Sequence, residues 1–539
     1  MRAPVQARGA QVLLSAALAG LACAGSGAPA KPAATAGSVD VQYEGGAPAR
    51  PDAPKPTIGL EFWADRKDLI QAPPPPKPEE LALPKVERFS LKNGLEVIVV
   101  PRKELPLASF SLSIEAGGYD ENRDVLGVSD FVAAMLRRGT KTRSADDISR
   151  AIDFVGGSLD ARASNDGTTA SCAALSKDAP LCLDLLADIV LRPSFPEAEM
   201  AEVRDQMLAG IAARFDSPHE LSMAHFSSLL FGEKNPEGWV LTAEDVNRLT
   251  RAQLEAFWRT FYRPNRAILA VAGDVDISRL RAAIDKAFGA WARAKVPARP
   301  GWTVPPVAGT SILLVDREDL TQATMVLGHQ GIKHADPRWY AATLTNYVLG
   351  GSDFSSRLMI EVRSKLGLTY GIGSSFGASL YEGAFRVTAS TKNGSAWEAL
   401  LATVNQIRKM QAAGPTTGEL DKAKGFYAGS YPFKLQTAGG VAAALVAAEQ
   451  HGLYASYVRE LPVRLAAVDQ PKAATVAGEL LHPDTLLVVI VGKASAIEPQ
   501  LAGKGIAYQR INFKDPISAA ARAAAKAKQP APAPSPPAK

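Results

Sequence analysis

The chain has 539 residues, 47% of them hydrophobic, and a formal net charge of +5. This length predicts about two to four domains of about 150 residues each, with an apolar content typical of globular proteins. The small and dispersed charge argues against a nucleic-acid-binding protein.

Residues 1–24 have the pattern of a secretory signal peptide. Two arginines precede a short apolar run, residues 12–22, which is too short to span a membrane. Cys23 stands where a lipoprotein signal places its acylated cysteine, but Gly20 replaces the usual aliphatic residue. Two alternatives stay open: a lipid anchor at Cys23, or simple cleavage after Ala22 or Ala24. Both predict an exported protein, either periplasmic or lipid-anchored to the cell envelope.

Both ends of the remaining chain have the composition of linkers. Residues 25–84 are rich in Pro and Ala and are expected to form a linker, with an apolar piece at 58–70 that docks on the folded body. Residues 515–539 are rich in Ala, Lys and Pro and are expected to be a disordered tail. Cys172 and Cys182 either pair or are buried as small apolar residues. No later segment has transmembrane length.

Between the ends, two sequence segments recur at nearly the same offset. YRPNRAILAVAGDVD at 262–276 is similar to LHPDTLLVVIVGKAS, with Pro264 and Pro483 separated by 219 positions. Residues 199–210 are similar to residues 419–430, at an offset of 220. Two matches at one offset predict a duplicated domain. The predicted domains are residues 85–298 and 299–514.

Each half has the same predicted order of elements. Two strands come first, then a long helix, two more strands, amphipathic helices and a closing strand. Apolar residues alternate along the strands, which favours a mostly antiparallel sheet with one face covered by helices. The expected strands lie within 90–102, 108–118, 158–175, 262–276, 310–318, 323–331, 371–390 and 481–495. The predicted fold class is α+β, with two homologous layered domains.

Several segments together resemble the pitrilysin/insulinase family of zinc metallopeptidases, the inverzincins, over roughly residues 85–513. The resemblance implies that the two domains are arranged as one half of a clam-shell. It rests on LKNGLEVIVVPR, EAGGYDENRDVLGVSDFVAAMLRRGTKTRSADDI, ARASNDGTTASCAAL, NPEGWVLTAEDVNRLT, YRPNRAILAVAGDVD and SRLMIEVRSKLGLTYGI.

The segment GVSDFVAAMLRRGT at 127–140 aligns with the helix that carries H-x-x-E-H in active members of this family. Asp130 and Ala134 stand in place of the two histidines, and Ala133 in place of the general base. Gly210 stands in place of the third ligand, a glutamate. One carboxylate cannot hold tetrahedral zinc, and no base remains to activate water. We expect a packed helix without a metal, and no cofactor in this chain.

The histidines elsewhere in the chain are not expected to form another zinc site. His219 and His225 in HELSMAH are six residues apart and therefore face different sides of a helix. His329 and His334 lie near a strand end, where local hydrogen bonds are expected.

The second half retains a different motif. Arg363 and Tyr370 resemble the family's R-x6-Y element, which implies that they bind the scissile carbonyl or the oxyanion of a peptide. The alternative is a surface arginine and a core tyrosine at a turn. Gly350 and Gly351 resemble the glycine-rich segment of non-catalytic subunits, where exposed backbone admits an extended peptide. The alternative there is an ordinary turn between helices.

Residues 161–170 resemble the strand that pairs with extended substrates in this family. Recognition of this kind relies on backbone hydrogen bonds and is indifferent to sequence. The same residues also suit an edge strand that polar residues protect from unwanted pairing.

The leading hypothesis is a non-catalytic, substrate-binding subunit of a heterodimeric, exported zinc metallopeptidase. The expected partner is a zinc-binding subunit of the same family with an intact H-x-x-E-H, and this chain supplies Arg363 and Tyr370 in trans. Zinc is expected only in that partner, and extended peptides are the expected substrates. The alternative is a peptide-binding or structural scaffold of the same fold without peptidase activity.

Overall fold

The computed structural model describes residues 79–453 and 456–518, which belong to one compact unit. The predicted signal peptide, Cys23, the piece at 58–70 and most of the predicted tail lie outside the described residues. Within the described part, no helix is both long and apolar enough to cross a bilayer.

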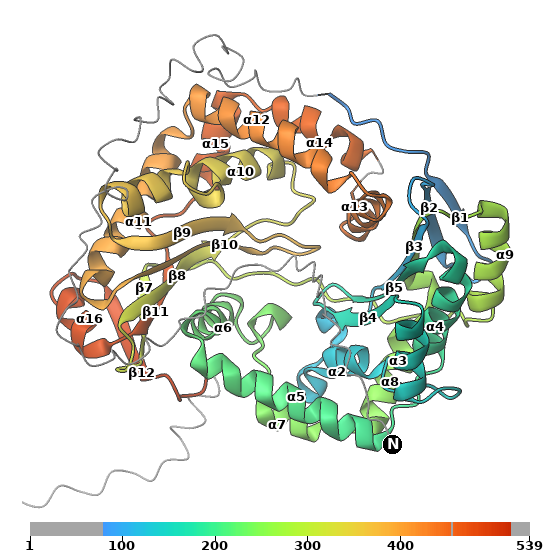
Figure 1. The fold of residues 1–539 in the computed structure, drawn as a ribbon. Helices are drawn as coiled ribbons and strands as arrows, with labels where there is room; N and C mark the ends of the chain where they lie inside the picture. Colours follow the sequence, from blue (N-terminus) through green and yellow to red (C-terminus); the bar gives the residue numbers. More distant parts are fainter. Residues whose placement is uncertain (1–78, 454–455, 519–539) are drawn as a thin grey trace, which may run out of the picture. The chain divides into compact units, whose positions relative to one another are not determined.

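The first half contains a six-stranded sheet of order β1-β2-β6-β3-β5-β4 (Figure 1). All neighbours are antiparallel except β2 and β6. Strand β4 forms one edge. The strands are β1 Glu87–Ser90, β2 Glu96–Pro101, β3 Leu107–Ile114, β4 Ser158–Ala163, β5 Thr168–Leu175 and β6 Ala267–Gly273.

Five strands of the second half repeat this topology in a sheet of order β12-β7-β11-β8-β10-β9, in which only the outer strand β12 differs. Strands β7 and β11 are parallel, as β2 and β6 are, and β9 occupies the edge that β4 occupies in the first sheet. The strands are β7 Ser311–Asp316, β8 Gln322–Gln330, β9 Thr369–Phe376, β10 Ala384–Lys392, β11 Leu487–Gly492 and β12 Ala507–Asn512. The expected α+β fold with two covered sheets is confirmed. The edge strands β1 and β12 were not predicted.

Helices of each half cover one face of its own sheet. In the first half the core lies between the sheet and α2 Val128–Met135, α3 Ala145–Phe154, α4 Ala179–Leu191, α5 Glu197–Asp216, α8 Arg251–Phe261 and α9 Ile277–Phe288; α7 Ala243–Arg248 packs on α5. In the second half it lies between the sheet and α10 Trp339–Asn346, α11 Ala396–Ala413, α12 Thr417–Lys434, α14 Tyr457–Ala466, α15 Gln470–Leu480 and α16 Ala494–Leu501.

The opposite face of each sheet is covered by a helix from the other half. Helix α13 (Ala438–Gln450) packs on β2 and β6 and lies beside β2 in Figure 1. This contact buries Ile98 and Val100 in one cluster with Leu445. Helix α6 (Pro218–Phe231) packs on β8 and β11, burying Phe226 and Leu230. The two helices begin at positions separated by the offset of the sequence repeat. The halves therefore exchange equivalent helices.

The structure also bears on the cysteine pair and on the predicted bounds of the linker and the tail. Cys172 and Cys182 form a disulfide, with Cα atoms 5.6 Å apart, that joins β5 to α4. The predicted linker to residue 84 ends too late, because the Leu81 amide donates to the Arg459 carbonyl and Leu83 packs against the α13 cluster. The tail predicted from residue 515 begins too early, because Ile517 is buried against the second sheet.

The helix exchange predicts a large stability effect for one leucine. Replacing Leu445 with alanine leaves a cavity between α13 and the first sheet, because its side chain is only 3% exposed. We expect a loss of about 2–5 kcal/mol in the free energy of unfolding, measured with urea. Leu401→Ala is the matched control, since Leu401 is 44% exposed on α11, and should change stability little. Equal effects of the two substitutions would contradict the described packing.

Candidate functional site

Helix α2 carries the three positions that align with the family's zinc motif. It begins after Gly127, whose φ of 86° favours glycine; a Cβ there would lie 2.6 Å from Leu241 Cδ1. The helix ends at Met135 and is shorter than the predicted segment 127–140. Asp130 and Ala134 are exposed, whereas Ala133 is buried. The solvent-facing side of α2 thus presents one carboxylate followed by a methyl group.

Glu121 holds the first turn of α2 in place. Its side chain accepts hydrogen bonds from the backbone N–H of Gly127 at 2.8 Å and of Ser129 at 2.7 Å, and from the Ser129 hydroxyl at 2.6 Å. These donors would otherwise be unsatisfied at a helix N-terminus. The carboxyl is buried, and burial raises its pKa to about 7 against the opposing effect of these hydrogen bonds. Sequence reasoning assigned no role to Glu121.

Asp130 faces a small recess at the same end of α2. The recess has a volume of about 150 Å³, and its lining includes Asn165, Trp239 and Leu241. Solvent reaches part of the Asp130 side chain, but the surrounding protein displaces enough water to raise the pKa of its carboxyl. Among the described residues, Asp130 has no hydrogen-bonding or ion-pair partner for this carboxylate.

The residues at this position do not fit a zinc ion. Ala133 and Ala134 offer no donor atom, and Gly210 is an exposed position of α5 with open space where a side chain would start. His225 is fully buried in α6, whereas His219 is exposed, so the two do not form a pair of ligands. Within residues 79–453 and 456–518, no cluster of three or more His, Cys, Asp or Glu side chains is arranged to hold a metal ion.

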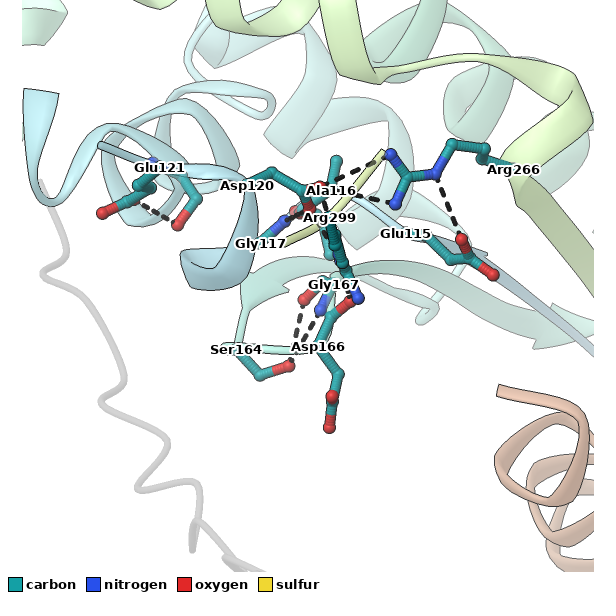
Figure 2. A network of polar contacts seen from close by, with 12 residues as sticks. Glu115, Ala116, Gly117, Asp120, Glu121, Ser164, Asp166, Gly167, Arg266 and Arg299 are labelled. Atoms are coloured by element: carbon teal, nitrogen blue, oxygen red, sulfur yellow. Dashed lines mark hydrogen bonds and ion pairs between the residues drawn. The ribbon is translucent and has the colours of Figure 1, made fainter. Parts of the chain in front are cut away.

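A buried ion-pair network supports the loop that leads into α2. Arg299 donates to both carboxylate oxygens of Asp120, at 3.0 and 2.6 Å, and to the Asp166 carbonyl at 2.6 Å. Arg266 lies 3.4 Å from Asp120 and 3.1 Å from Glu115. Figure 2 shows both guanidinium groups converging on Asp120, with Glu121 apart from them. Because Arg299 belongs to the connection between the two sheets, the network ties that connection to the candidate site.

Residues from the second half also reach this loop. The Tyr119 hydroxyl lies 2.6 Å from Glu237 and 3.3 Å from the Ser379 hydroxyl, and its ring makes an edge contact with Tyr381 at 4.7 Å. Ser379 and Tyr381 belong to the β9–β10 connection.

Contrary to expectation, His334 makes long-range rather than only local contacts. Its ring nitrogens lie 2.9 Å from His451 Nδ1 and 3.0 Å from the Tyr457 hydroxyl. Burial lowers the pKa of His334 to about 4, so the imidazole is neutral near pH 7. His329 pairs locally with the Gln330 carbonyl but also accepts from the His482 amide.

Arg363 and Tyr370 lie in neighbouring segments at the β9 edge of the second sheet. Arg363 is in η8 (Met359–Lys365), a π-helical segment that packs on β9, and its guanidinium lies 4.6 Å from the Phe354 ring centre. No ion pair among the described residues involves Arg363. Tyr370 is the second residue of β9 and is 77% exposed, so the alternative of a core tyrosine is wrong. In the described part of the chain, no hydrogen bond, ion pair or ring contact joins Arg363 or Tyr370 to Asp130.

Gly350 and Gly351 lie in η7 (Tyr347–Gly351), which also packs on β9. Gly350 is buried, and a Cβ there would lie 2.6 Å from Ser374 Oγ and 2.7 Å from Leu358 Cδ1. The expectation of exposed glycine backbone is therefore wrong for Gly350, which is small so that η7 can approach β9. It holds for Gly351, which is exposed.

The segment 161–170 forms the end of β4, a turn and the start of β5. β4 is the edge strand of the first sheet and packs beside α2. Arg137, just after α2, donates to the Leu159 carbonyl and lies 3.7 Å from Asp160. One end of β4 thus lies beside Arg137, and Ser164 and Asn165, which follow its other end, line the recess beside Asp130.

Comparison with known proteins gives one consistent family. The family described as Insulinase (Peptidase family M16) matches residues 97–237, and Peptidase M16 inactive domain matches residues 248–426. An uncharacterized zinc protease of Mycobacterium tuberculosis is 32% identical over 356 residues, or 65% of this chain and 80% of that protein. An uncharacterized zinc protease of Streptomyces coelicolor is 29% identical over 412 residues, which cover 75% of this chain and 89% of that protein.

Solved structures agree with these sequence matches. A peptidase M16 inactive domain from Pseudomonas fluorescens superposes with a TM-score of 0.71 at 26% identity, covering 79% of this chain and all of that one. A protease from Helicobacter pylori has a TM-score of 0.69 at 21% identity, covering 76% of this chain and 100% of its own, and supports the fold alone.

Glu121 predicts a specific pH dependence of stability. Its proton is bound more tightly in the folded chain than in the unfolded chain, where the pKa is about 4.3. The stabilisation is therefore complete below that value and is lost as the pH rises through about 7. Through Glu121, the free energy of unfolding of the wild type should therefore be about 3 kcal/mol larger at about pH 4 than at about pH 8.5. We expect this contribution to be absent from the Glu121→Gln variant.

Asp124→Asn is the control for this measurement, because Asp124 is an exposed carboxylate in the same loop. Urea unfolding of the wild type and both variants at the two pH values gives the comparison. A Glu121→Gln variant with the pH dependence of the wild type would show that the carboxyl is not the group responsible.

Proposed function

Since the chain belongs to the M16 (insulinase) family of peptidases, we propose that it is a non-catalytic, substrate-binding subunit of a heterodimeric zinc metallopeptidase. In this proposal the partner is a family member with an intact H-x-x-E-H. This chain binds extended peptides and supplies Arg363 and Tyr370 in trans to the partner's zinc site.

The asymmetry between the two halves is the observation that supports this proposal. The first half keeps the zinc helix in place but presents Asp130 and Ala134 where ligands are needed. The second half keeps an arginine without an ion-pair partner in the described chain and an exposed tyrosine at a strand edge. An exposed tyrosine and an unpaired arginine add little to stability, so a binding role accounts for them better than packing does.

The chemistry of the pair suits a developing oxyanion. Arg363 offers a permanent positive charge with several donors, and the Tyr370 hydroxyl offers one more. Donors directed at charge that grows in the transition state lower the barrier more than they strengthen substrate binding. Peptide binding along an open strand edge would hold the scissile bond in an extended conformation.

Export is part of the same proposal. The described disulfide between Cys172 and Cys182 is typical of proteins in oxidising compartments. Together with the signal-like residues 1–24, it supports a periplasmic or envelope location, with Cys23 as the residue that a lipid anchor would use.

The alternative proposal is a peptide-binding scaffold without an enzymatic partner. The position of β4 at the edge of the first sheet supports it equally, because an added strand pairs with the backbone of an edge strand. In that case Arg363 and Tyr370 contribute to binding and not to turnover.

A mixing experiment tests the role of Arg363. The chain is combined with a family member from the same organism that has an intact H-x-x-E-H, and cleavage of a quenched peptide is followed. We expect Arg363→Ala to lower kcat of the mixture on the order of 10²-fold, as for the loss of one oxyanion donor. The control is Arg408→Ala. It removes an exposed arginine of α11 that pairs with Asp484, and it should leave the rate unchanged.

An unchanged rate with Arg363→Ala would contradict the role in trans. Peptide binding without any turnover in the mixture would favour the scaffold instead.

Metal analysis tests the absence of autonomous catalysis. We expect the purified chain to contain far less than stoichiometric zinc by mass spectrometry, because Ala133 and Ala134 provide no ligands. The catalytic partner, purified in the same way, serves as the positive control. Stoichiometric zinc in this chain, lost with chelator together with peptide cleavage, would overturn the proposal.

A further inference from the structure

The recess beside Asp130 lies where an extended peptide on β4 would pass. Ser164 and Asn165 line it, and they directly follow the last residue of this edge strand. The Gly118 amide donates to the Ser164 carbonyl at 3.1 Å and the Tyr119 amide to the Asn165 carbonyl at 3.0 Å. These bonds hold the end of β4 against the loop that leads to α2. The recess is therefore a fixed continuation of the strand edge.

No cationic side chain of the described chain pairs with the carboxylate in this recess. Asp130 has no cationic partner there, and the oxygens of the neighbouring Glu121 already accept three hydrogen bonds. Arg123 is the nearby cation on the Trp239 ring, at 5.8 Å, but it makes no ion pair with Asp130. Burial raises the pKa of the Asp130 carboxyl, which is the effect expected of a carboxylate that lacks a counter-charge.

A carboxylate elsewhere on this edge provides the contrast. Asp160, on β4, is paired with Arg162 and lies 3.7 Å from Arg137. The hydrogen bond from Arg162 holds the pKa of its carboxyl below the ordinary value. Asp160 is thus paired with arginines of the chain, whereas Asp130 has no such partner among the described residues.

We propose that the Asp130 recess binds a cationic nitrogen of the extended peptide, supplied by a lysine or arginine side chain or by the terminal ammonium. This subsite rests on the proposed peptide-binding role. Asp130 supplies the negative charge, and the Trp239 ring in the wall supplies an aromatic surface that attracts cations. A volume of about 150 Å³ admits a single nitrogen-bearing group and not a whole residue with its neighbours.

The chemistry of the lining favours an organic cation over a metal ion. Ala133 and Ala134 provide no ligands beside Asp130, and one carboxylate cannot complete the shell of a divalent ion. An ammonium or guanidinium group needs fewer anionic partners, because hydrogen bonds to neutral oxygens satisfy its remaining donors. Asn165 belongs to the same lining, and its side-chain amide contains such an oxygen.

Fluorescence anisotropy with labelled Thr/Val peptides tests this subsite on the chain alone. The reference peptide is acetylated and neutral. One series moves a single lysine along that peptide, and another peptide is neutral with a free amino terminus. We expect a lysine at one position, or the free terminus, to increase affinity about tenfold over the reference. The peptides that bind more tightly than the reference show whether a lysine side chain or the terminal ammonium supplies the cation.

Asp130→Asn should abolish this gain while leaving the affinity for the reference peptide unchanged. Asp124→Asn, which removes an exposed carboxylate outside the recess lining, should retain the gain. Equal binding of all peptides by the wild type, or a gain that survives Asp130→Asn, would overturn the cationic subsite while leaving peptide binding intact. Failure of every peptide to bind would reject the subsite and the proposed peptide-binding role together.

Discussion

The exchange of helices between the two halves is the contact on which the rest of the structure depends. Each sheet has one face covered by helices of its own half and the other by a helix from the opposite half. Without α13, Ile98 and Val100 of the first sheet would face water, and without α6 the second sheet would lose the cover over β8 and β11. Apolar burial on both faces is what allows central strands such as β6 and β11 to be almost wholly apolar. Neither half has a complete core of its own, so the candidate site is held by the whole described unit.

In the first half, several contacts support the helix that aligns with the family's zinc motif. The glycine that starts α2, the Glu121 cap and the Asp120–Arg299 ion pair all fix the helix in position. The exposed side of that helix carries no metal ligands beyond Asp130. At the edge of the second sheet, by contrast, a polar side chain is available at the surface: Tyr370 is exposed and contributes little to the core. A fold that keeps both scaffolds while changing the side chains on one of them is consistent with a divided function.

Sequence reasoning found what local patterns determine. The offset between Pro264 and Pro483 predicted the duplication, and alternating apolar residues predicted β3, β8 and their neighbours. The position of Asp130 and Ala134 on one helix followed from the motif. The helix exchange was not predictable, because α6 and α13 carry no signal of which sheet they cover. Arg299 was missed for the same reason: its partner Asp120 lies 179 positions away, and only the folded chain brings them together. The burial of Gly350 depends on Ser374, another contact that spacing does not reveal.

The order of the helices along the chain also has a consequence for the timing of folding. The first sheet is complete at Gly273, but the helix that covers its second face begins only at Ala438. At a synthesis rate of about 5–20 residues per second, roughly 8–33 seconds separate the two. During that interval the apolar positions on β2 and β6 have no cover. A chain translocated before it folds avoids this exposure during synthesis, since sheet and helix then become available together.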